Sequence, residues 1–379
     1  MAQARAGALP LRRLWRTTLP DYPIGLAWSP DGSALLAVPA TGEILILAAE
    51  DAHVLGRYPG HAGGNLTGAW SPAAPLIATG GQDGQVRLHA LDPATPTRSF
   101  GPGRGWIEKL EWSSDGNQLA VAQGKTVHLL RPDLTPIFAW SAHAGTVADL
   151  TWSPEGDRVA VATYTGLVVW NKQADTPERT LEWDGSSLKV AWSPDGAFLA
   201  SGDQTPTVHL WNLASNENLV MRGYETKITA LAWSHDSRFL ATAGGCDAVV
   251  WDCSGVGPEG SKPITLEGHS ERISCLAFQH RNNLLASGDA DGLALVWWPE
   301  RHPAPLLAFL LDAPVAAVAW HPNDAALAIA SASGEINLCR LPTEAELAEG
   351  LPGTSRGDGR TDEPGANGPG PHEYKFAWW

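Results

Sequence analysis

The four cysteines are the first side chains to weigh for chemistry in this chain of 379 residues, because a thiolate can bind a metal or act as a nucleophile. They are Cys246, Cys253, Cys275 and Cys339, all in the last third of the sequence. A metal site would need the first three to converge, but six residues separate Cys246 from Cys253, which is not the short spacing of zinc-binding pairs. We therefore predict free cysteines that pack on strands as small apolar side chains, with no metal and no other cofactor.

Other residue types give no catalytic motif either. The chain has neither the G-x-x-x-x-G-K-[ST] phosphate loop nor the H-E-x-x-H zinc motif, and it has no Cys-x-x-Cys pair. Asp31, Asp115 and Asp195 each follow a serine by two residues and precede a glycine, which is typical of an aspartate that hydrogen-bonds its own turn. We therefore predict that the protein is not an enzyme and has no catalytic residues.

The composition limits the classes of partner. Lysine and arginine number 26 and aspartate and glutamate 41, a formal net charge of −15 at pH 7, and no basic stripe is visible. Such a surface repels phosphate backbones, so we expect no nucleic acid partner. No run approaches the roughly 18 apolar residues of a membrane-spanning helix, and the first residues do not read as a secretory leader. We therefore expect a cytoplasmic protein that makes no contact with the membrane.

One short pattern recurs eight times and defines the elements that position every other residue. It reads AWSPDG at 27–32 and again at 191–196, with an aromatic at the second place of every copy. Successive aromatics are separated by 42, 42, 40, 40, 41, 45 and 42 residues, which indicates one structural unit copied eight times. The eight aromatics are Trp28, Trp70, Trp112, Trp152, Trp192, Trp233, Phe278 and Trp320.

Each unit contains four short β-like runs. An apolar run ends at the aromatic, a turn follows, and two alternating runs come next, such as 198–203 (FLASGD) and 207–213 (TVHLWNL). A last run such as 263–268 (PITLEG) closes the unit. Alternation without a helical period predicts an antiparallel four-stranded sheet. Because one such sheet cannot bury both of its faces, the eight sheets must stack against each other in a ring.

The recurring hexamer is then a corner of the sheet. Pro30 presets φ for a type I turn, Asp31 can bond the local backbone, and Gly32 tolerates a positive φ. Trp28 ends the preceding strand, and we predict that its ring fills the gap between neighbouring sheets.

The chain resembles the WD40-repeat family of β-propellers, and free-standing bacterial members of it in particular, from about residue 14 to 341. The resemblance rests on the period, on Gly268-His269 before the seventh unit, and on pairs such as Trp251-Asp252 at the end of third strands. It implies a buried polar tetrad in the seventh unit that is structural rather than catalytic. The implied tetrad residues are His269, Ser287, Asp291 and Trp297.

Other units depart from this tetrad, so their polar networks are predicted to differ. The fourth unit lacks the Asp, and the second has the expected His, hydroxyl and Asp but no Trp. The substituted positions are His89 in place of Trp in the second unit, and Trp183 and Tyr224 in place of His in the fifth and sixth. We expect these blades to depend more on apolar packing.

Closure of the ring is predicted from an unequal strand count. Eight third strands can be counted, but a Gly/Pro-rich tract follows the last one, and the one unassigned β-like run is 13–19 (RLWRTTL). We predict that this run supplies the outer strand of the last blade and closes a single all-β, eight-bladed propeller of four-stranded antiparallel blades, with seven blades as the alternative. Residues 1–12 then form an N-terminal extension, 13–342 the propeller and 343–379 a flexible tail.

The resemblance also selects candidate partner-binding residues. In WD40 proteins the positions six and four residues before the aromatic often border the face that binds partners. The residues of interface-enriched or charged type at these positions are Tyr22, Trp106, Glu108, Lys227 and Arg272. Trp106 stands out because it lies among glycines in 101–110 (GPGRGWIEKL). The alternative is that these side chains only cover the rim of the channel.

Two further segments are candidates for binding because they break the repeat. The longest interval places a Gly/Pro/Ser-rich loop at 253–262, which is either a tolerated insertion or a partner-binding loop. The chain ends in YKFAWW at 374–379, after a tract that cannot fold alone. Phe376, Trp378 and Trp379 are predicted either to dock on the propeller itself or to anchor the protein to a partner.

The leading functional prediction is a non-catalytic scaffold, monomeric by itself, that holds one or more proteins on its face and through its tail. The competing prediction is a small-ligand-binding or enzymatic propeller that uses the central channel. Runs expected to line the channel, such as 228–233 (ITALAW), are mostly small and apolar, which favours the scaffold.

Overall fold

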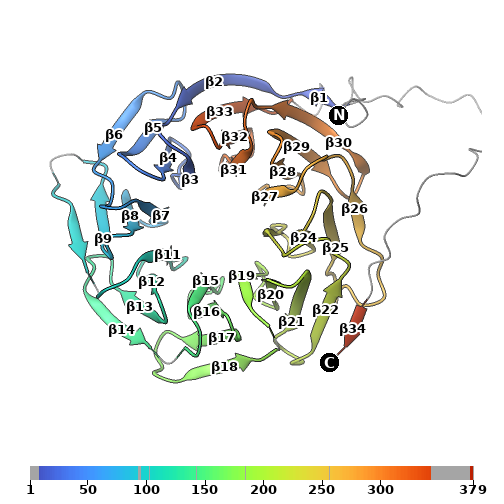
Figure 1. The fold of residues 1–379 in the computed structure, drawn as a ribbon, viewed down its shortest axis with the longest axis horizontal. Helices are drawn as coiled ribbons and strands as arrows, with labels where there is room; N and C mark the ends of the chain where they lie inside the picture. Colours follow the sequence, from blue (N-terminus) through green and yellow to red (C-terminus); the bar gives the residue numbers. More distant parts are fainter. Residues whose placement is uncertain are drawn as a thin grey trace, which may run out of the picture.

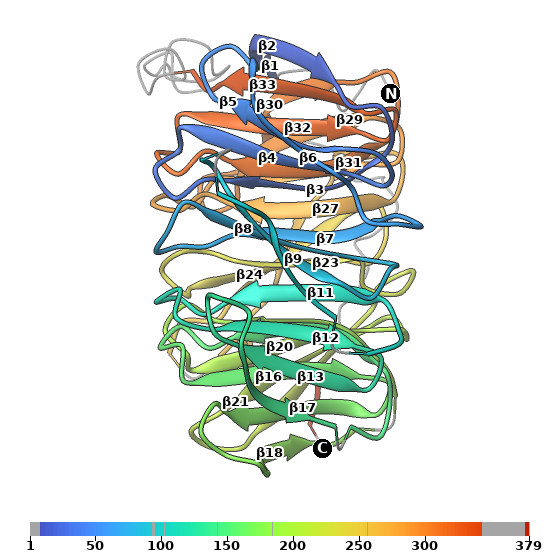
Figure 2. The same cartoon turned by 90° about the vertical axis from the view of Figure 1, so that its left-hand side faces the viewer.

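The computed structural model describes residues 8–92, 95–101, 103–141, 143–183, 185–255, 257–342 and 376–378. Within these residues the chain forms strands and turns and no helix. The strands make eight sheets that surround a central axis as the blades of a propeller (Figure 1). Seen from the side, the strands run across the thickness of the disc (Figure 2). The predicted eight-bladed, all-β fold is confirmed, and the seven-bladed alternative is wrong.

Blades one to four each contain four consecutive antiparallel strands, counted from the axis outward. Their bounds are β3 (Pro23–Trp28), β4 (Ala34–Pro39), β5 (Ile44–Ala48) and β6 (Val54–Tyr58); β7 (Asn65–Trp70), β8 (Leu76–Gly81), β9 (Val86–Ala90) and β10 (Arg98–Phe100); β11 (Ile107–Trp112), β12 (Leu119–Gln123), β13 (Thr126–Leu130) and β14 (Pro136–Trp140); and β15 (Val147–Trp152), β16 (Arg158–Thr163), β17 (Gly166–Asn171) and β18 (Pro177–Leu181).

Blades five to eight repeat this order, with additions from the two ends of the chain. Their bounds are β19 (Ser187–Trp192), β20 (Phe198–Asp203), β21 (Thr207–Asn212) and β22 (Asn218–Arg222); β23 (Ala230–Trp233), β24 (Phe239–Ala243), β25 (Ala248–Asp252) and β26 (Ile264–Leu266); β27 (Ile273–Phe278), β28 (Leu285–Asp289), β29 (Leu293–Trp298) and β30 (His302–Leu310); and β31 (Val315–Trp320), β32 (Ala326–Ser331) and β33 (Glu335–Arg340), with β2 (Arg12–Thr18) outermost. The additions are β1 (Leu9–Pro10) on blade seven and β34 (Phe376–Trp378) on blade five.

The N-terminal segment closes the ring, as predicted from the missing outer strand. β2 pairs antiparallel with β33, from Arg12 opposite Arg340 to Thr18 opposite Glu335. Trp15 is buried beside blade one, and its indole N–H donates to the Ala49 carbonyl at 2.8 Å. The first segment of the chain therefore completes the last blade, covers the edge of β33 and binds the first blade.

The same segment also reaches blade seven, which the sequence pattern did not indicate. β1 pairs in parallel with β30, with Leu9 opposite Leu307. The next residue, Leu11, is buried, and its N–H donates to the Ala308 carbonyl at 3.0 Å. The residues assigned to an N-terminal extension thus include a short strand that ties blade seven to blade eight.

The hexamer forms the predicted corner. The Gly32 N–H donates to the Ser29 carbonyl at 2.9 Å, and Gly32 has a φ of +75°, as a glycine in this turn should. The Asp31 carboxylate accepts from the Ser29 hydroxyl at 2.6 Å and from the Ser33 N–H at 3.0 Å. Equivalent Ser–Asp hydrogen bonds recur at Ser113, Ser193 and Ser234.

The tryptophan of the hexamer is more than a filler of volume, because its indole N–H connects adjacent blades. All of these tryptophans except Trp112 donate to the carbonyl of the residue that precedes the aromatic in the previous blade. Six such hydrogen bonds are formed, by Trp28 to Ala319, Trp70 to Ala27, Trp152 to Glu111, Trp192 to Thr151, Trp233 to Ala191 and Trp320 to Ala277. The bond from Trp28 crosses the seam, so the same device also closes the ring.

The hydrophobic core lies between blades rather than within one central cluster. At the seam, Trp15 and Leu338 of blade eight pack with Leu35 and Leu47 of blade one, and all four are buried. Similar apolar clusters join the other neighbours, for example Leu110 of blade three with Ala78 of blade two. The core therefore fixes the relative positions of the blades, and with them the loops on both faces of the disc.

Candidate protein-binding face

The polar tetrad of blade seven is present, but its acid is not the predicted residue. His269 Nδ1 donates to Asp289 Oδ2 at 2.8 Å, His269 Nε2 lies 2.7 Å from Ser287 Oγ, and the Trp297 indole donates to the same hydroxyl at 2.7 Å. The prediction of Asp291 is wrong, because Asp291 is exposed in the following turn. Asp289 is two residues after Ser287 on β28, so both side chains point to the same side of the strand.

In blade two the acid comes from the turn, as the sequence indicated. His61 Nδ1 donates to Asp83 at 2.8 Å, and Thr79 Oγ1 lies 2.9 Å from His61 and 3.0 Å from His89. His89 is buried in the place of the usual tryptophan, and burial lowers its pKa to about 4. The imidazole is therefore neutral at pH 7 and closes the network by hydrogen bonding rather than by charge.

Blade four keeps the histidine, with the Trp170 indole donating to His143 Nε2 at 2.9 Å, whereas blades five and six have other hydrogen-bonding groups at that position. In blade five the Trp183 indole donates to Ser187 at 3.0 Å, and Asp203 accepts from that hydroxyl at 3.2 Å. In blade six Tyr224 Oη lies 2.8 Å from Thr242 Oγ1. Burial raises the pKa of Asp203 to about 8, so this carboxyl carries its proton at neutral pH. All these groups lie inside blades, where they stabilise the sheets and cannot reach a partner.

The candidate binding residues lie at the ends of the inner strands. We call the side of the disc at which β3, β7, β11, β15, β19, β23, β27 and β31 begin the upper face, and the opposite side, which carries the hexamer turns, the lower face. In seven of the eight blades the inner strand has a bulge that takes the residue four places before the aromatic out of the ladder. A bulge re-aims the side chain, which explains why Glu108 and Ser274 are exposed on an otherwise half-buried strand.

The residue six places before the aromatic is held by a hydrogen bond of its backbone. In five blades its carbonyl accepts from an N–H in the turn that follows the second strand of the same blade. This bond immobilises the main chain and leaves the side chain free. The five acceptors are Tyr22, Gly64, Ser186, Arg272 and Pro314, at 2.7 to 3.0 Å. The upper face thus presents side chains from a rigid frame, and rigidity reduces the entropy lost when a partner binds.

The predicted residues are all exposed, but they do not form one cluster. Tyr22 is 45% exposed and Trp106 52% exposed, while Glu108, Lys227 and Arg272 are also on the surface. Lys227 and Arg272 lie on adjacent blades six and seven, whereas Trp106 belongs to blade three, on the far side of the ring from Arg272. A small partner can contact either Trp106 or the pair Lys227 and Arg272, and only a large partner can contact both at once.

Trp106 is held by an unusual loop. Gly105 has a φ of +135°, a conformation that favours glycine, and its carbonyl accepts from Gln123 Nε2 at 2.9 Å. Gln123 ends β12 and is buried, so a core residue fixes the loop that carries the exposed ring.

The structure adds a residue that the sequence reasoning missed. Tyr164 is 49% exposed in the turn between β16 and β17, which also lies on the upper face. The turn is stabilised by Thr163, whose Oγ1 accepts from the Thr165 N–H at 3.2 Å and donates to the Gly166 carbonyl at 3.0 Å. The available signal was the short TYTG turn at 163–166, which lacks the usual aspartate.

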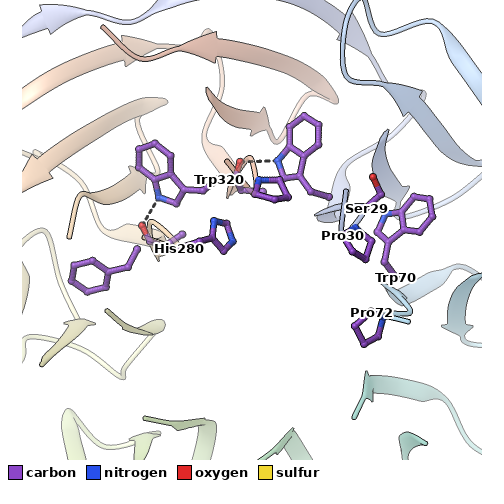
Figure 3. A pocket seen from close by; sticks show the side chains of 11 residues that line it. Ser29, Pro30, Trp70, Pro72, His280 and Trp320 are labelled. Carbon is purple, nitrogen blue, oxygen red and sulfur yellow. Dashed lines mark hydrogen bonds between the residues drawn. The ribbon is translucent and has the colours of Figure 1, made fainter. Parts of the chain in front are cut away.

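The lower face has a pocket of about 540 Å³ at the inner ends of four blades (Figure 3). It is built by the hexamers themselves, with the rings of Trp28, Trp70 and Trp320 and the adjacent prolines in its wall. The three indole N–H groups already donate to carbonyls of neighbouring blades. His280 Nδ1 is likewise engaged by Asp324, at 3.0 Å. The wall therefore offers apolar surface and few free polar groups.

The cysteines do not converge. All four are free, and Cys253 and Cys339 are buried. Burial raises the pKa of Cys275 to about 11 and that of Cys339 to about 12, so both are thiols at neutral pH. Among the described residues, no group of three or more His, Cys, Asp or Glu side chains could hold a metal ion. The described part of the chain also has no helix long and apolar enough to span a membrane.

The two segments that break the repeat both lie beside blade five. The loop after β25 places Gly257, Pro258 and Glu259 next to Phe198 and Leu219 of that blade. β34 pairs antiparallel with the edge of β22, with Trp378 opposite Leu219 and Phe376 opposite Met221. The tail backbone therefore docks on its own propeller, whereas Trp379 lies outside the described residues.

The family model described as "WD domain, G-beta repeat" matches residues 52–89, 176–212, 216–252 and 260–297. The Anaphase-promoting complex subunit cdc20 of Dictyostelium discoideum is 27% identical over 133 residues, 34% of this chain and 26% of the relative. Protein FIZZY-RELATED 1 of Arabidopsis thaliana is 30% identical over 158 residues, 41% of this chain and 32% of the relative. The F-box-like/WD repeat-containing protein TBL1X of Mus musculus is 30% identical over 168 residues, 40% of this chain and 31% of the relative.

The matched region thus spans about a third or less of these curated relatives. Among solved structures, the crystal structure of the computationally designed Ika8 protein has a TM-score of 0.75 and 18% identity, and the match covers 87% of this chain and all of the designed one. That likeness concerns the fold alone.

Proposed function

We propose that this eight-bladed WD40-repeat β-propeller is a non-catalytic scaffold that binds one or more proteins on its upper face. The observation that carries the proposal is the presence of three exposed aromatic side chains on that face, Tyr22, Trp106 and Tyr164. Each belongs to a turn or loop whose backbone is hydrogen-bonded in place. We place the protein in the cytoplasm, as a monomer when no partner is bound.

The energetic argument starts from the area that these rings leave in water. An aromatic side chain buries 150–250 Å² when fully covered, and burial contributes about 25 cal/mol per Å². A half-exposed Trp106 can therefore contribute roughly 2–3 kcal/mol on being covered, which is the size of a hot-spot residue. Nearby Glu108 supplies charge at the margin of the same site, and Lys227 and Arg272 do so across the ring.

The relatives support a binding role in general terms. One of them is named as a subunit of the anaphase-promoting complex, and is therefore part of an assembly. Because the match covers only part of each relative, the identity of their partners is not carried over to this chain.

The tail is proposed as a second point of attachment. β34 occupies the edge of β22, and an edge strand is a ready template for an added strand. We propose that Phe376, Trp378 and Trp379 leave this edge to anchor a partner. Hydrogen exchange of residues 370–379 and of β22, measured with and without the partner, tests this. Slower exchange at β22 in the free protein than in the complex supports release of β34, and unchanged exchange at β22 contradicts it.

The central test compares partner capture by matched variants. Trp106→Ala and Tyr164→Ala together remove two rings from the upper face, and Leu55→Ala removes a side chain of similar exposure from the outer edge of blade one. Proteins captured by the wild type and by Leu55→Ala but lost with the double variant, and then bound by purified protein with a weaker Kd, support the proposal. Equal capture by all three would exclude this face.

The competing class, a propeller that processes a small molecule at its axis, makes a different prediction. Its product would form with purified protein alone, and the surface variants would leave turnover unchanged. A metabolite screen with the wild-type protein is the corresponding experiment.

A further inference from the structure

Charged side chains on the inner strands gather on one arc of the ring. Counted from the aromatic of each blade, the third residue before it is Lys109, Asp149 and Lys189 in blades three, four and five. The equivalent residues elsewhere are small: Gly25, Thr67, Ala230, Cys275 and Ala317. Each of these positions pairs in the same register with its second strand, so they lie at one level around the axis.

One further ionisable side chain lies on the same arc. The residue just before the aromatic is Glu111 in blade three, whereas six other blades have alanine there and one has threonine. Glu111 Oε1 accepts from the Thr151 hydroxyl at 3.2 Å and from the Trp152 N–H at 3.3 Å. Burial raises the pKa of Glu111 to about 8, so this carboxyl is mostly protonated and uncharged at neutral pH.

The carboxylate of Asp149 is fully committed to its neighbours. Its Oδ1 is 3.2 Å from Lys109 Nζ, and its Oδ2 accepts from the Val190 N–H at 3.3 Å. Among the described residues, no hydrogen bond or ion pair holds the ammonium group of Lys189. Burial, together with the nearby charge of Lys109, lowers the pKa of Lys189. The arc therefore holds two ammonium groups and one carboxylate, which forms its ion pair with Lys109 and acts on Lys189 without a hydrogen bond in the described structure, so one positive charge is in excess.

Water reaches this arc from the axis. The Lys109 side chain is 37% exposed although it stands on an innermost strand, and Lys189 is half-buried. The side chains at the same level on the other five blades are small. An uncompensated cation in such an enclosed position attracts an anion more strongly than a surface lysine does, because the surrounding protein screens its charge less than water would.

We propose that the axis at blades three to five is a binding site for a small oxyanion, held by the ammonium groups of Lys189 and Lys109. Oxyanion oxygens accept charge-assisted hydrogen bonds from both lysines, and the Glu111 carboxyl supplies a further O–H donor beside them. The site is independent of the proposed partner-binding face. Carboxylates and phosphate share this chemistry, and the experiment separates them.

The test uses the full-length protein in a low-salt buffer near pH 7, with sodium acetate and inorganic phosphate as the two probes. Titration calorimetry should give saturable binding of at least one probe with a stoichiometry of one. Lys189→Met should weaken it about tenfold or more, the loss of one charge-assisted hydrogen bond, while Lys227→Met on the upper face leaves it unchanged. Lys189 has no hydrogen-bond or ion-pair partner among the described residues, so its variant should keep the wild-type Tm.

A residue-level readout complements the titration. Limited acetylation followed by mass spectrometry should show that the bound probe slows modification of Lys189 and Lys109 but not of Lys227. Two results would overturn the proposal: no saturable binding of either probe, or equal slowing at all three lysines, which would indicate general screening by salt.

Discussion

The inter-blade hydrogen bond of the recurring tryptophan can be measured by comparing Trp152→Phe with Trp112→Phe. Both tryptophans end an inner strand and both are 5% exposed, so the two substitutions remove similar volume from similar surroundings. They differ in one respect. The Trp152 indole donates to the Glu111 carbonyl at 2.9 Å, whereas the Trp112 Nε1 is buried without a hydrogen-bond partner in the described structure.

The difference in free energy of unfolding follows from these two environments. Trp152→Phe loses a hydrogen bond with a net contribution of about 1 kcal/mol, in addition to the cost of lost packing. Trp112→Phe loses packing but removes a buried unsatisfied donor, which itself costs roughly 1–3 kcal/mol in the wild type. We therefore expect Trp152→Phe to be less stable than Trp112→Phe by about 2–4 kcal/mol.

Differential scanning calorimetry provides the assay. With an unfolding entropy of about 2.1 cal/mol/K per residue, a ring of about 330 residues loses roughly 3–6 °C in Tm for this difference. The midpoints of urea unfolding should fall in the same order. Equal Tm values for the two variants would refute the reasoning and would leave the tryptophan with volume as its only role.

Three further predictions concern the seam, one histidine and the tetrad. Deletion of residues 1–20 removes β1 and β2, exposes the edges of β30 and β33, and should lower the Tm sharply in a thermal scan; an unchanged Tm would contradict closure by these strands. The pKa of His89 is lowered to about 4 in the folded state, so the unfolded state takes up its proton first and stability is lost as pH falls from about 6.5 to 4. His89→Trp should reduce that loss in urea titrations between these pH values, and a parallel loss in both proteins would rule out the assignment. Asp289→Ala breaks a buried pair and should cost about 3–5 kcal/mol, whereas Asp291→Ala should stay within about 0.5 kcal/mol, as measured by urea unfolding; the reverse order would restore Asp291 to the tetrad.

The blade count and the closing strand could be predicted because both depend on a pattern that is repeated. Eight aromatics at near-constant spacing fix eight inner strands, and a missing outer strand must be supplied by some other run. β1 could not be predicted, since two residues carry no period and Leu9 and Pro10 alone are not distinctive. β1 pairs with β30 because β2 begins next to blade seven, so that the residues just before β2 lie beside β30.

The acid of the blade-seven tetrad shows why a single residue of a site is harder to predict from sequence than the fold. The segment Ser287–Asp291 contains two aspartates, and the family pattern places the acid at the second one, as in blade two with Asp83. The second strands of blades two and seven end at the same place, two residues after the hydroxyl, but that residue is Gly81 in blade two and Asp289 in blade seven. Asp289 therefore reaches the histidine from the strand and leaves Asp291 in the turn, whereas in blade two the carboxylate comes from the turn residue Asp83. The family pattern does not specify which aspartate is used when both positions carry one.

Some positions carry the same residue type in nearly every unit and others vary from unit to unit, and this difference has a structural cause. A position is constrained when its side chain is the hydrogen-bonding group, as for the indole of Trp152, or when it must pack between blades. A position is free when its backbone alone carries the frame, as at Tyr22 and Arg272, whose carbonyls are bonded whatever side chain they bear. The third inner-strand residue before the aromatic also varies, from Gly25 to Lys109 and Lys189, without a change in its strand pairing. A ring built in this way can vary its upper face and its axis independently, so the proposed binding face and the proposed oxyanion site place separate demands on the chain.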